Sequence, residues 1–165
     1  VDVVTNLIAD FRSRGGVPDR EMLGLAGVCW VKMGRLDLVD QSVARMRSNR
    51  LFPTHDLYAH LVTAHADDVE YVDAAWDQIR LEAPHTQEIP GEIVCNALMR
   101  AYRHTKNIGR SLEVLQEMKN SYGYQPSPTV LRLVLETAIL AEARSTAERL
   151  VQEIQTAEKA VPSST

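Results

Sequence analysis

"EIVCNALMRAYRHT" (Glu92–Thr105) and, after a short turn, "IGRSLEVLQEMKNSYG" (Ile108–Gly123) are the two segments that decide the fold class. In both segments apolar residues recur at steps of three and four, which places them on one face of an α-helix. The sequence therefore predicts a pair of helices. A single pair cannot bury both of its faces, so it needs similar pairs beside it.

Prolines recur at a nearly constant distance along the chain. Five of the seven prolines share this spacing, with separations of 35, 37, 36 and 36 residues: Pro18, Pro53, Pro90, Pro126 and Pro162. An even period of this length is the signature of a helical-repeat array. The residues that follow these prolines all belong to the set favoured at helix N-caps, and we predict that each caps the next helix: Asp19, Thr54, Gly91, Ser127 and Ser163.

The helix pair recurs in every unit, for example in "REMLGLAGVCWVKMG" (Arg20–Gly34) followed by "RLDLVDQSVARMRSN" (Arg35–Asn49). We predict an all-α fold, a single right-handed α-solenoid of stacked antiparallel helix pairs with about 4.5 repeats. The boundaries that the prolines give are a trailing half unit at 1–20 and full units at 21–55, 56–92, 93–128 and 129–165. We name the full units by their first residues: the Glu21, Asp56, Ile93 and Thr129 units.

The composition of the 165 residues is ordinary for a globular protein, with 45% hydrophobic and 24% charged residues. The net charge is −4 and the pI about 5.7. Binding of nucleic acid through bulk charge needs clustered Lys and Arg, so this charge argues against it. No apolar run approaches the roughly 18 residues that span a bilayer, and we expect no membrane partner. Because the chain begins at Val1 in the middle of a pattern, we expect a fragment or a processed chain.

The apolar stripe of the first full unit is predicted to face the core: Met22, Leu25, Ala26, Cys29, Trp30 and Met33. We interpret both cysteines, Cys29 and Cys95, as small core residues rather than as part of a disulfide framework. Four aromatic residues on the helical stripes are capable of stacking on bases, but the apolar pattern favours core packing for them: Trp30, Tyr58, Trp76 and Tyr102.

The histidines and serines of the chain do not form a metal-binding or catalytic pattern. His55, His60 and His65 are five residues apart, whereas two metal ligands on one helix need a spacing of three or four. "GRSLE" (Gly109–Glu113) lacks the second glycine and the preceding strand of a nucleophile elbow. We therefore predict no enzymatic activity, no metal site and no cofactor in this chain.

Taken together, these features resemble the pentatricopeptide repeat family. The resemblance is carried by "CNALMRAY" (Cys95–Tyr102) with "LEVLQEMKNSYGYQPS" (Leu112–Ser127), and by "GLAGVCWVKMGRLD" (Gly24–Asp37) with "MRSNRLFPT" (Met46–Thr54). The Asp56 unit has extra residues in its loops, and the Thr129 unit lacks the glycine between its helices. Tetratricopeptide repeats are the alternative, but their Trp and Leu-Gly positions do not occur at the right offsets.

The resemblance implies positions that contact RNA, since in this family each repeat reads one base with two or three side chains. The reading positions are the fourth residue of the first helix and the residue after the closing proline. The first residue of the unit wedges against the base. In the Ile93 unit, the wedge Ile93, the amide of Asn96 and the hydroxyl of Ser127 form the most complete set, one that resembles a reader of pyrimidines, cytosine more than uracil. Asn96 is also interpretable as an ordinary polar residue of the helix surface.

The other units carry weaker sets. The pairs are Gly24 with Thr54 and Ala59 with Gly91, both behind acidic wedges, and Arg132 with Ser163, where Arg132 can hold a phosphate or stack on a base. The resemblance also places Lys32 and His104 where the family keeps basic residues toward phosphate. Solvent-exposed surface residues are the alternative interpretation of both.

The degraded reading positions and the acidic charge favour one function over two others. We expect a non-enzymatic helical-repeat scaffold in a mitochondrial ribonucleoprotein assembly, such as a mitoribosome or an RNA-processing complex, with RNA and protein subunits as partners. The mitochondrial location follows from the resemblance alone. The alternatives are a sequence-specific binder of single-stranded RNA and a peptide-binding adaptor like the tetratricopeptide repeats.

Overall fold

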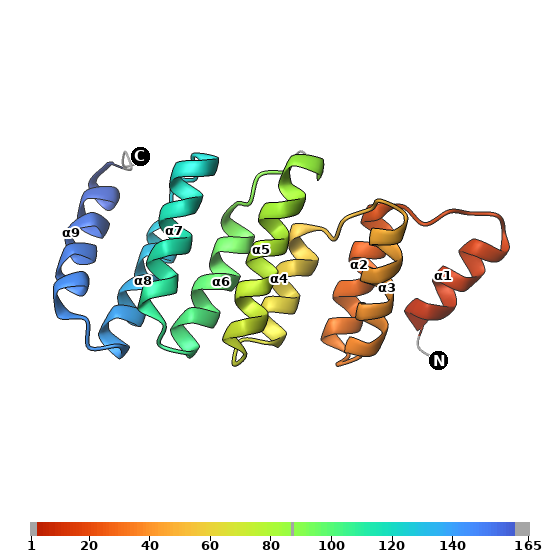
Figure 1. The fold of residues 1–165 in the computed structure, drawn as a ribbon, viewed down its shortest axis with the longest axis horizontal. Coiled ribbons are helices and arrows are strands. Elements are labelled where there is room, and N and C mark those ends of the chain that lie inside the picture. Colours follow the sequence, from red (N-terminus) through yellow and green to blue (C-terminus); the bar gives the residue numbers. More distant parts are fainter. Residues whose placement is uncertain (1–2, 87, 161–165) are drawn as a thin grey trace, which may run out of the picture.

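The structure, a computed structural model, describes residues 3–86 and 88–160, with side chains described as far as Thr156. The described residues are all-α, and they form nine helices and no strand (Figure 1). Every helix that the sequence predicted is present. The helices are α1 (Val3–Ser13), α2 (Arg20–Lys32), α3 (Leu36–Ser48), α4 (His55–Ala64), α5 (Val69–Thr86), α6 (Glu92–His104), α7 (Ile108–Tyr122), α8 (Pro128–Leu140) and α9 (Arg144–Ala160).

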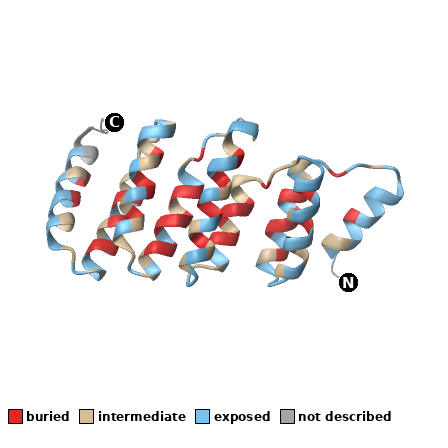
Figure 2. Cartoon of the chain, viewed as in Figure 1, coloured by how far each residue is buried: buried red, intermediate tan, exposed pale blue. Residues whose placement is uncertain are grey.

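The helices follow one another along a single row (Figure 1). The first helices of the units, α2, α4, α6 and α8, contact each other in that order. Each second helix contacts the first helix of its own unit, and α1 contacts α2. This arrangement makes two layers, and the buried residues lie where the layers and the neighbouring first helices meet (Figure 2).

The caps follow the prolines as predicted. The side chains of Asp19, Thr54 and Ser127 accept hydrogen bonds from the backbone N–H groups three residues further on, at 2.8, 3.2 and 3.3 Å. Gly91 occupies the same N-cap position before α6 with an extended backbone and no side-chain bond. Ser163 lies outside the described residues. The periodic joint is therefore a helix start repeated along the chain.

The centre of the array is densely packed. Leu98, Tyr102 and Met118 are fully buried between the helices of the Ile93 unit and its neighbours. The four aromatic side chains predicted to lie in the core, including Trp30 and Trp76, are all buried. Their rings are therefore not available to stack on a base.

The first full unit departs from its predicted burial. Leu25 is 64% exposed, Met33 is 47% exposed and Cys29 is exposed, so the prediction that they lie in the core is wrong. Cys95 is buried as predicted, and burial raises the pKa of its thiol to about 12. The difference is that α6 contacts a first helix on each side, whereas within the described residues α2 contacts only the following one.

Polar contacts hold the divergent Asp56 unit to its neighbours. The side chain of Glu82 on α5 is 6% exposed, and it accepts a hydrogen bond from the hydroxyl of Tyr58 at 2.7 Å and pairs with Arg47 at 3.1 Å. Arg20 donates to the backbone oxygens of Phe52 and Pro53, at 2.8 and 3.0 Å, and pairs with Glu88. Arg20 thereby connects the start of α2 with the linkers that precede α4 and α6. These contacts restrain the longer loop of the Asp56 unit.

Candidate nucleic-acid interface

Asn96 and Ser127, the reading pair that the resemblance implies for the Ile93 unit, meet on one carboxylate. The Nδ2 of Asn96 donates to Oε1 of Glu92 at 3.0 Å, and the Oγ of Ser127 donates to the same oxygen at 2.6 Å. The hydroxyl of Tyr124 donates to the other oxygen, Oε2. The fold therefore brings the two reading positions together, with the side chain of Glu92, the last residue of the preceding unit, between them.

This arrangement uses one N–H of the Asn96 amide and the hydroxyl proton of Ser127, two of the donors that a base would need. The hydroxyl of Ser127 gives its proton to Glu92 and accepts from the backbone of Val130, so both of its roles are used. The Oδ1 of Asn96 is buried and has no hydrogen-bond partner among the described residues. A buried acceptor of this kind cannot reach a base without a movement of the side chain. The wedge residue Ile93, in contrast, is 57% exposed.

The reading positions of the Glu21 unit are adjacent in the same way but carry no usable pair. A Cβ on Gly24 would lie 2.8 Å from Cγ2 and 2.9 Å from Oγ1 of Thr54, so the two residues are in direct contact. Thr54 cannot turn away freely because its hydroxyl caps α4. The absence of a side chain at Gly24 is thus part of the packing of this joint.

The remaining units add little to a base-reading surface. Ala59 is buried and Gly91 has no side chain, so the Asp56 unit offers no side-chain hydrogen bond at these positions. Arg132 is exposed on α8, and Ser163, its predicted partner, lies outside the described residues. The structure therefore brings together one reading pair with polar side chains on both members.

The two basic residues expected near phosphate differ in their surroundings. Lys32 is exposed at the end of α2. Nε2 of His104 lies 2.7 Å from Oδ1 of Asp67. His104 therefore has a carboxylate beside it, and this negative charge opposes the approach of a phosphate.

Glu92 is the residue of this site that the sequence interpretation missed. It lies four residues before Asn96, which is the spacing at which side chains on a helix contact each other, and this spacing was the available signal. Glu21 and Asp56 occupy the first turns of α2 and α4, so acidic residues begin three first helices of the array. Carboxylates stabilise the positive ends of helices, and here they also place negative charge beside the reading positions.

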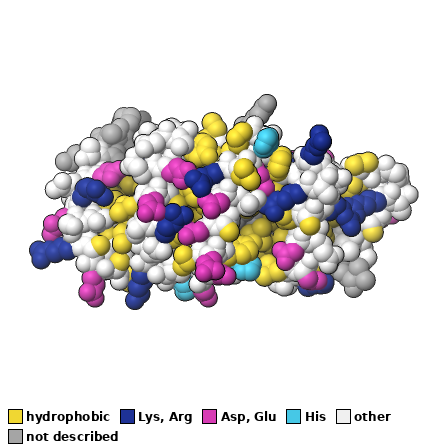
Figure 3. All heavy atoms as spheres, in the orientation of Figure 1, with side chains coloured by type: hydrophobic (Ala, Val, Ile, Leu, Met, Phe, Trp, Pro, Cys, Tyr) yellow, Lys and Arg dark blue, Asp and Glu magenta, His cyan; other side chains and the backbone are white. Residues whose placement is uncertain are grey.

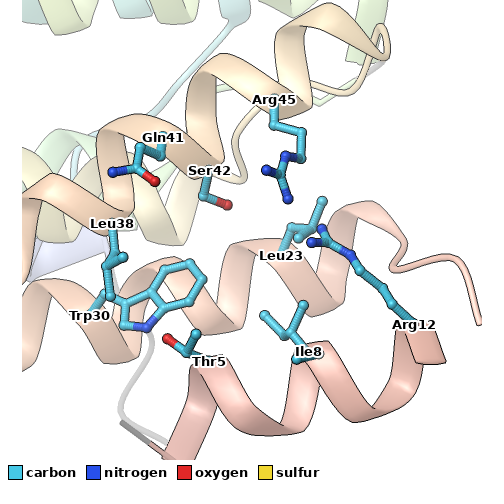
Figure 4. Close-up of a pocket in the computed structure, with 10 residues that line it drawn as sticks. Thr5, Ile8, Arg12, Leu23, Trp30, Leu38, Gln41, Ser42 and Arg45 are labelled. Carbon is cyan, nitrogen blue, oxygen red and sulfur yellow. The ribbon is translucent and has the colours of Figure 1, made fainter. Parts of the chain in front are cut away.

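A small pocket lies where α1, α2 and α3 meet (Figure 4). Its volume is about 230 Å³, and the side chains of Arg12 and Arg45 point toward it from the last turns of α1 and α3. The hydroxyl-bearing Ser42 and the amide of Gln41 also line it, and none of the described residues that line it carries a carboxylate. Two guanidinium groups without an acidic neighbour in the lining can hold an anion such as a phosphate. The sequence analysis gave no signal for this Arg12–Arg45 pocket.

One face of the array is mixed in charge. On the face drawn in Figure 3, Lys and Arg side chains are interspersed with Asp and Glu. Within residues 3–86 and 88–160 there is no group of three or more His, Cys, Asp or Glu that could hold a metal ion. Among the helices described, none is long and apolar enough to cross a membrane.

Comparisons with known proteins give no family. No protein-family model matches the chain, and no curated protein is significantly similar to it.

Proposed function

We propose that the chain is a non-enzymatic helical-repeat scaffold of the pentatricopeptide type, working within a mitochondrial ribonucleoprotein assembly. In this proposal its units form a right-handed α-solenoid with the boundaries given by the periodic prolines. The repeated capped joint, the contacts between successive first helices and the row of helix pairs support it. The exposed faces of the array contact protein subunits, and RNA is held through its backbone rather than through its bases.

One observation carries the choice of a scaffold over a sequence-specific reader. The only reading pair in the described residues with polar side chains on both members, Asn96 and Ser127, is engaged by Glu92. A base would have to displace a carboxylate from two hydrogen bonds before it could be read. Both bonds lie at an exposed carboxylate, so a base competes with Glu92 and with water for the same donors.

The Arg12–Arg45 pocket supports weak backbone binding. Phosphate contacts fix position but carry no sequence information. A pocket whose described lining holds two arginines and no carboxylate is suited to this kind of contact, and it lies between α1, α2 and α3, away from Asn96 on α6. We therefore expect RNA binding that is weak, dependent on salt and indifferent to sequence.

Fluorescence anisotropy with a panel of short single-stranded RNAs tests the proposal. We expect dissociation constants above about 1 μM, similar for all sequences, and weaker at higher salt. The double variant Arg12→Gln/Arg45→Gln should reduce this binding and flatten its salt dependence, because two phosphate contacts are lost. Arg149→Gln, an exposed arginine of α9, is the matched control. Sub-micromolar binding with a strong preference for one sequence would refute the scaffold.

A sequence-specific reader of single-stranded RNA is the second candidate. It is favoured by the meeting of Asn96 and Ser127, since the two reading positions are in register as a base contact requires. Purification of the full-length protein from its natural source separates the two candidates. A scaffold should copurify with a constant set of protein subunits, and a reader with one RNA sequence.

A further inference from the structure

Ion pairs connect the second helices of successive units. Arg47 on α3 pairs with Glu82 on α5 at 3.1 Å, and Lys119 on α7 pairs with Glu153 on α9 at 2.8 Å. At both joints the basic residue belongs to the earlier helix and the carboxylate to the later one. Opposite charges therefore meet where one second helix lies beside the next.

The Arg12–Arg45 pocket lies at the first joint of this kind, between α1 and α3. Counted back from the closing prolines, Arg12 and Arg47 both lie six residues before a proline. Arg45 and Glu82 both lie eight residues before one. The first joint thus has an arginine at the position where the next joint has its carboxylate. Like charges repel each other, and an anion between the two arginines would take the part of the carboxylate.

The joint between α5 and α7 is also closed by opposite charges, although its register is shifted. Pro84 holds the position that corresponds to Arg12, and Arg80 lies four residues earlier, about one helical turn away. Arg80 pairs with Glu117 on α7 at 2.7 Å. Among the joints between described second helices, the one with Arg12 is therefore the exception.

The pocket offers further donors beside the two guanidinium groups. Ser42 is 8% exposed, its hydroxyl points into the pocket, and no other described residue forms a hydrogen bond with it (Figure 4). The amide of Gln41 also lines the pocket. A buried hydroxyl without a partner is costly, and an anion in the pocket would accept a hydrogen bond from it.

The place of the pocket in the array does not depend on what precedes α1. The corresponding space between α3 and α5 is lined by α3, α4, α5 and Pro53, and none of its described lining residues precedes α3. The described lining of the space between α7 and α9 comes from these two helices. An earlier unit therefore leaves such a joint open.

The size and charge of the pocket favour a terminal phosphate as its ligand. Its volume of about 230 Å³ is below the roughly 300–1,000 Å³ of pockets that take a whole small molecule, and it suits a single phosphate group. A phosphomonoester carries a charge of about −1.5 to −2 at pH 7 and three acceptor oxygens, which match two guanidinium groups. An internal phosphate has one charge and a chain on both sides. Ile8 and Leu23 line the pocket and are buried, so a strand cannot pass through it.

We propose that the Arg12–Arg45 pocket binds the phosphomonoester at an end of an RNA strand in preference to the internal phosphates. The terminal phosphate takes the place that Glu82 holds at the next joint, and it connects α1 with α3. The inference rests on the proposed function, which supplies RNA as the partner. It names the part of the RNA that the pocket recognises.

Three RNA strands of one sequence, different only at their ends, test the proposal with the whole chain. The internally labelled strands carry a 5′-phosphate, a 3′-phosphate or hydroxyls at both ends. In fluorescence anisotropy at matched ionic strength, we expect a phosphorylated strand to bind about tenfold more tightly than the hydroxyl strand. Arg45→Glu gives this joint the charges of the Arg47–Glu82 joint and should abolish the preference, as should Arg12→Glu. Arg100→Glu, at an exposed arginine of α6, is the matched control and should keep it.

Equal binding of the three strands would overturn the proposal. So would a preference that survives Arg12→Glu and Arg45→Glu in proteins that circular dichroism melts show to be folded. Inorganic phosphate alone and a phosphoserine peptide are two further arms. If either binds in a way that Arg45→Glu abolishes while the three strands bind equally, the ligand is a free ion or a phosphoprotein and not an RNA end. Because the strands share one sequence, none of these results decides between a scaffold and a sequence-specific reader.

Discussion

The joint at Gly24 and Thr54 and the joint at Asn96 and Ser127 occupy the same positions in their units and differ in chemistry. In the first, the helix position has no side chain and its Cα faces Thr54 directly. In the second, an amide and a hydroxyl are present, and both donate to Glu92. In both cases the residue after the proline also caps the next helix.

The comparison separates what the repeat needs from what base reading needs. The cap is kept in both joints because it begins the next helix. The side chains that would contact a base are either missing or engaged by a neighbour. Base reading can thus be lost in two ways while the architecture stays the same: the side chain is missing, or a neighbouring side chain occupies it. Substitutions at the two joints distinguish these cases.

The largest loss of stability is expected from a substitution in the core beneath the Asn96 joint. Leu98 is fully buried on α6, and its counterpart beneath the Gly24 joint is the smaller Ala26, also buried. Leu98→Asp places a charge in this core and should lower the free energy of unfolding by about 4 kcal/mol. Urea denaturation measures the loss, with Leu81→Asp on the exposed face of α5 as a near-neutral control. An unchanged unfolding midpoint for Leu98→Asp would show that the register of the array is wrong.

A moderate loss of stability is expected when the asparagine of the Asn96 joint is placed at Gly24. Gly24→Asn introduces a Cβ within 3 Å of the Thr54 side chain, and the capping bond keeps Thr54 in place. We expect a loss of about 2 kcal/mol in thermal or urea unfolding, although Asn is slightly better than Gly inside a helix.

The second variant of this pair identifies the cause. Thr54→Ser removes Cγ2 and keeps the capping oxygen, so Gly24→Asn/Thr54→Ser should recover part of the stability that Gly24→Asn alone loses. If Gly24→Asn alone is neutral, Thr54 does not limit the side chain at Gly24.

The smallest effect on stability is expected at Asn96 itself. Its Oδ1 is buried without a partner, and its Nδ2 makes one hydrogen bond near the surface. Asn96→Ala removes both, so we expect a change of less than about 0.5 kcal/mol and an unchanged circular dichroism spectrum. Any base preference of the protein should change in this variant. A large fall in melting temperature would instead make Asn96 a structural residue.

The helices and their caps follow from local sequence, and contacts between distant residues do not. The apolar spacing and the N-cap residue predict α6 and its start at Gly91, because a helix and its cap depend on neighbours a few residues away. The exposure of Leu25 and Cys29 was not predictable in this way, because burial depends on whether another helix covers them. The contact from Ser127 to Glu92 joins residues 35 apart, and it exists only once the units stack.

The measurement that tests the central claim most directly is a parallel RNA titration of the natural sequence and Glu92→Ala. If Glu92 occupies the reading position, the natural sequence should bind a cytosine-rich and an adenine-rich single strand equally weakly. Glu92→Ala should bind the cytosine-rich strand about tenfold more tightly, and Asn96→Ala added to it should abolish that gain. Glu148→Ala, which removes an exposed carboxylate paired on α9, serves as the control. Tight, selective binding by the natural sequence that Glu92→Ala does not alter would contradict the account.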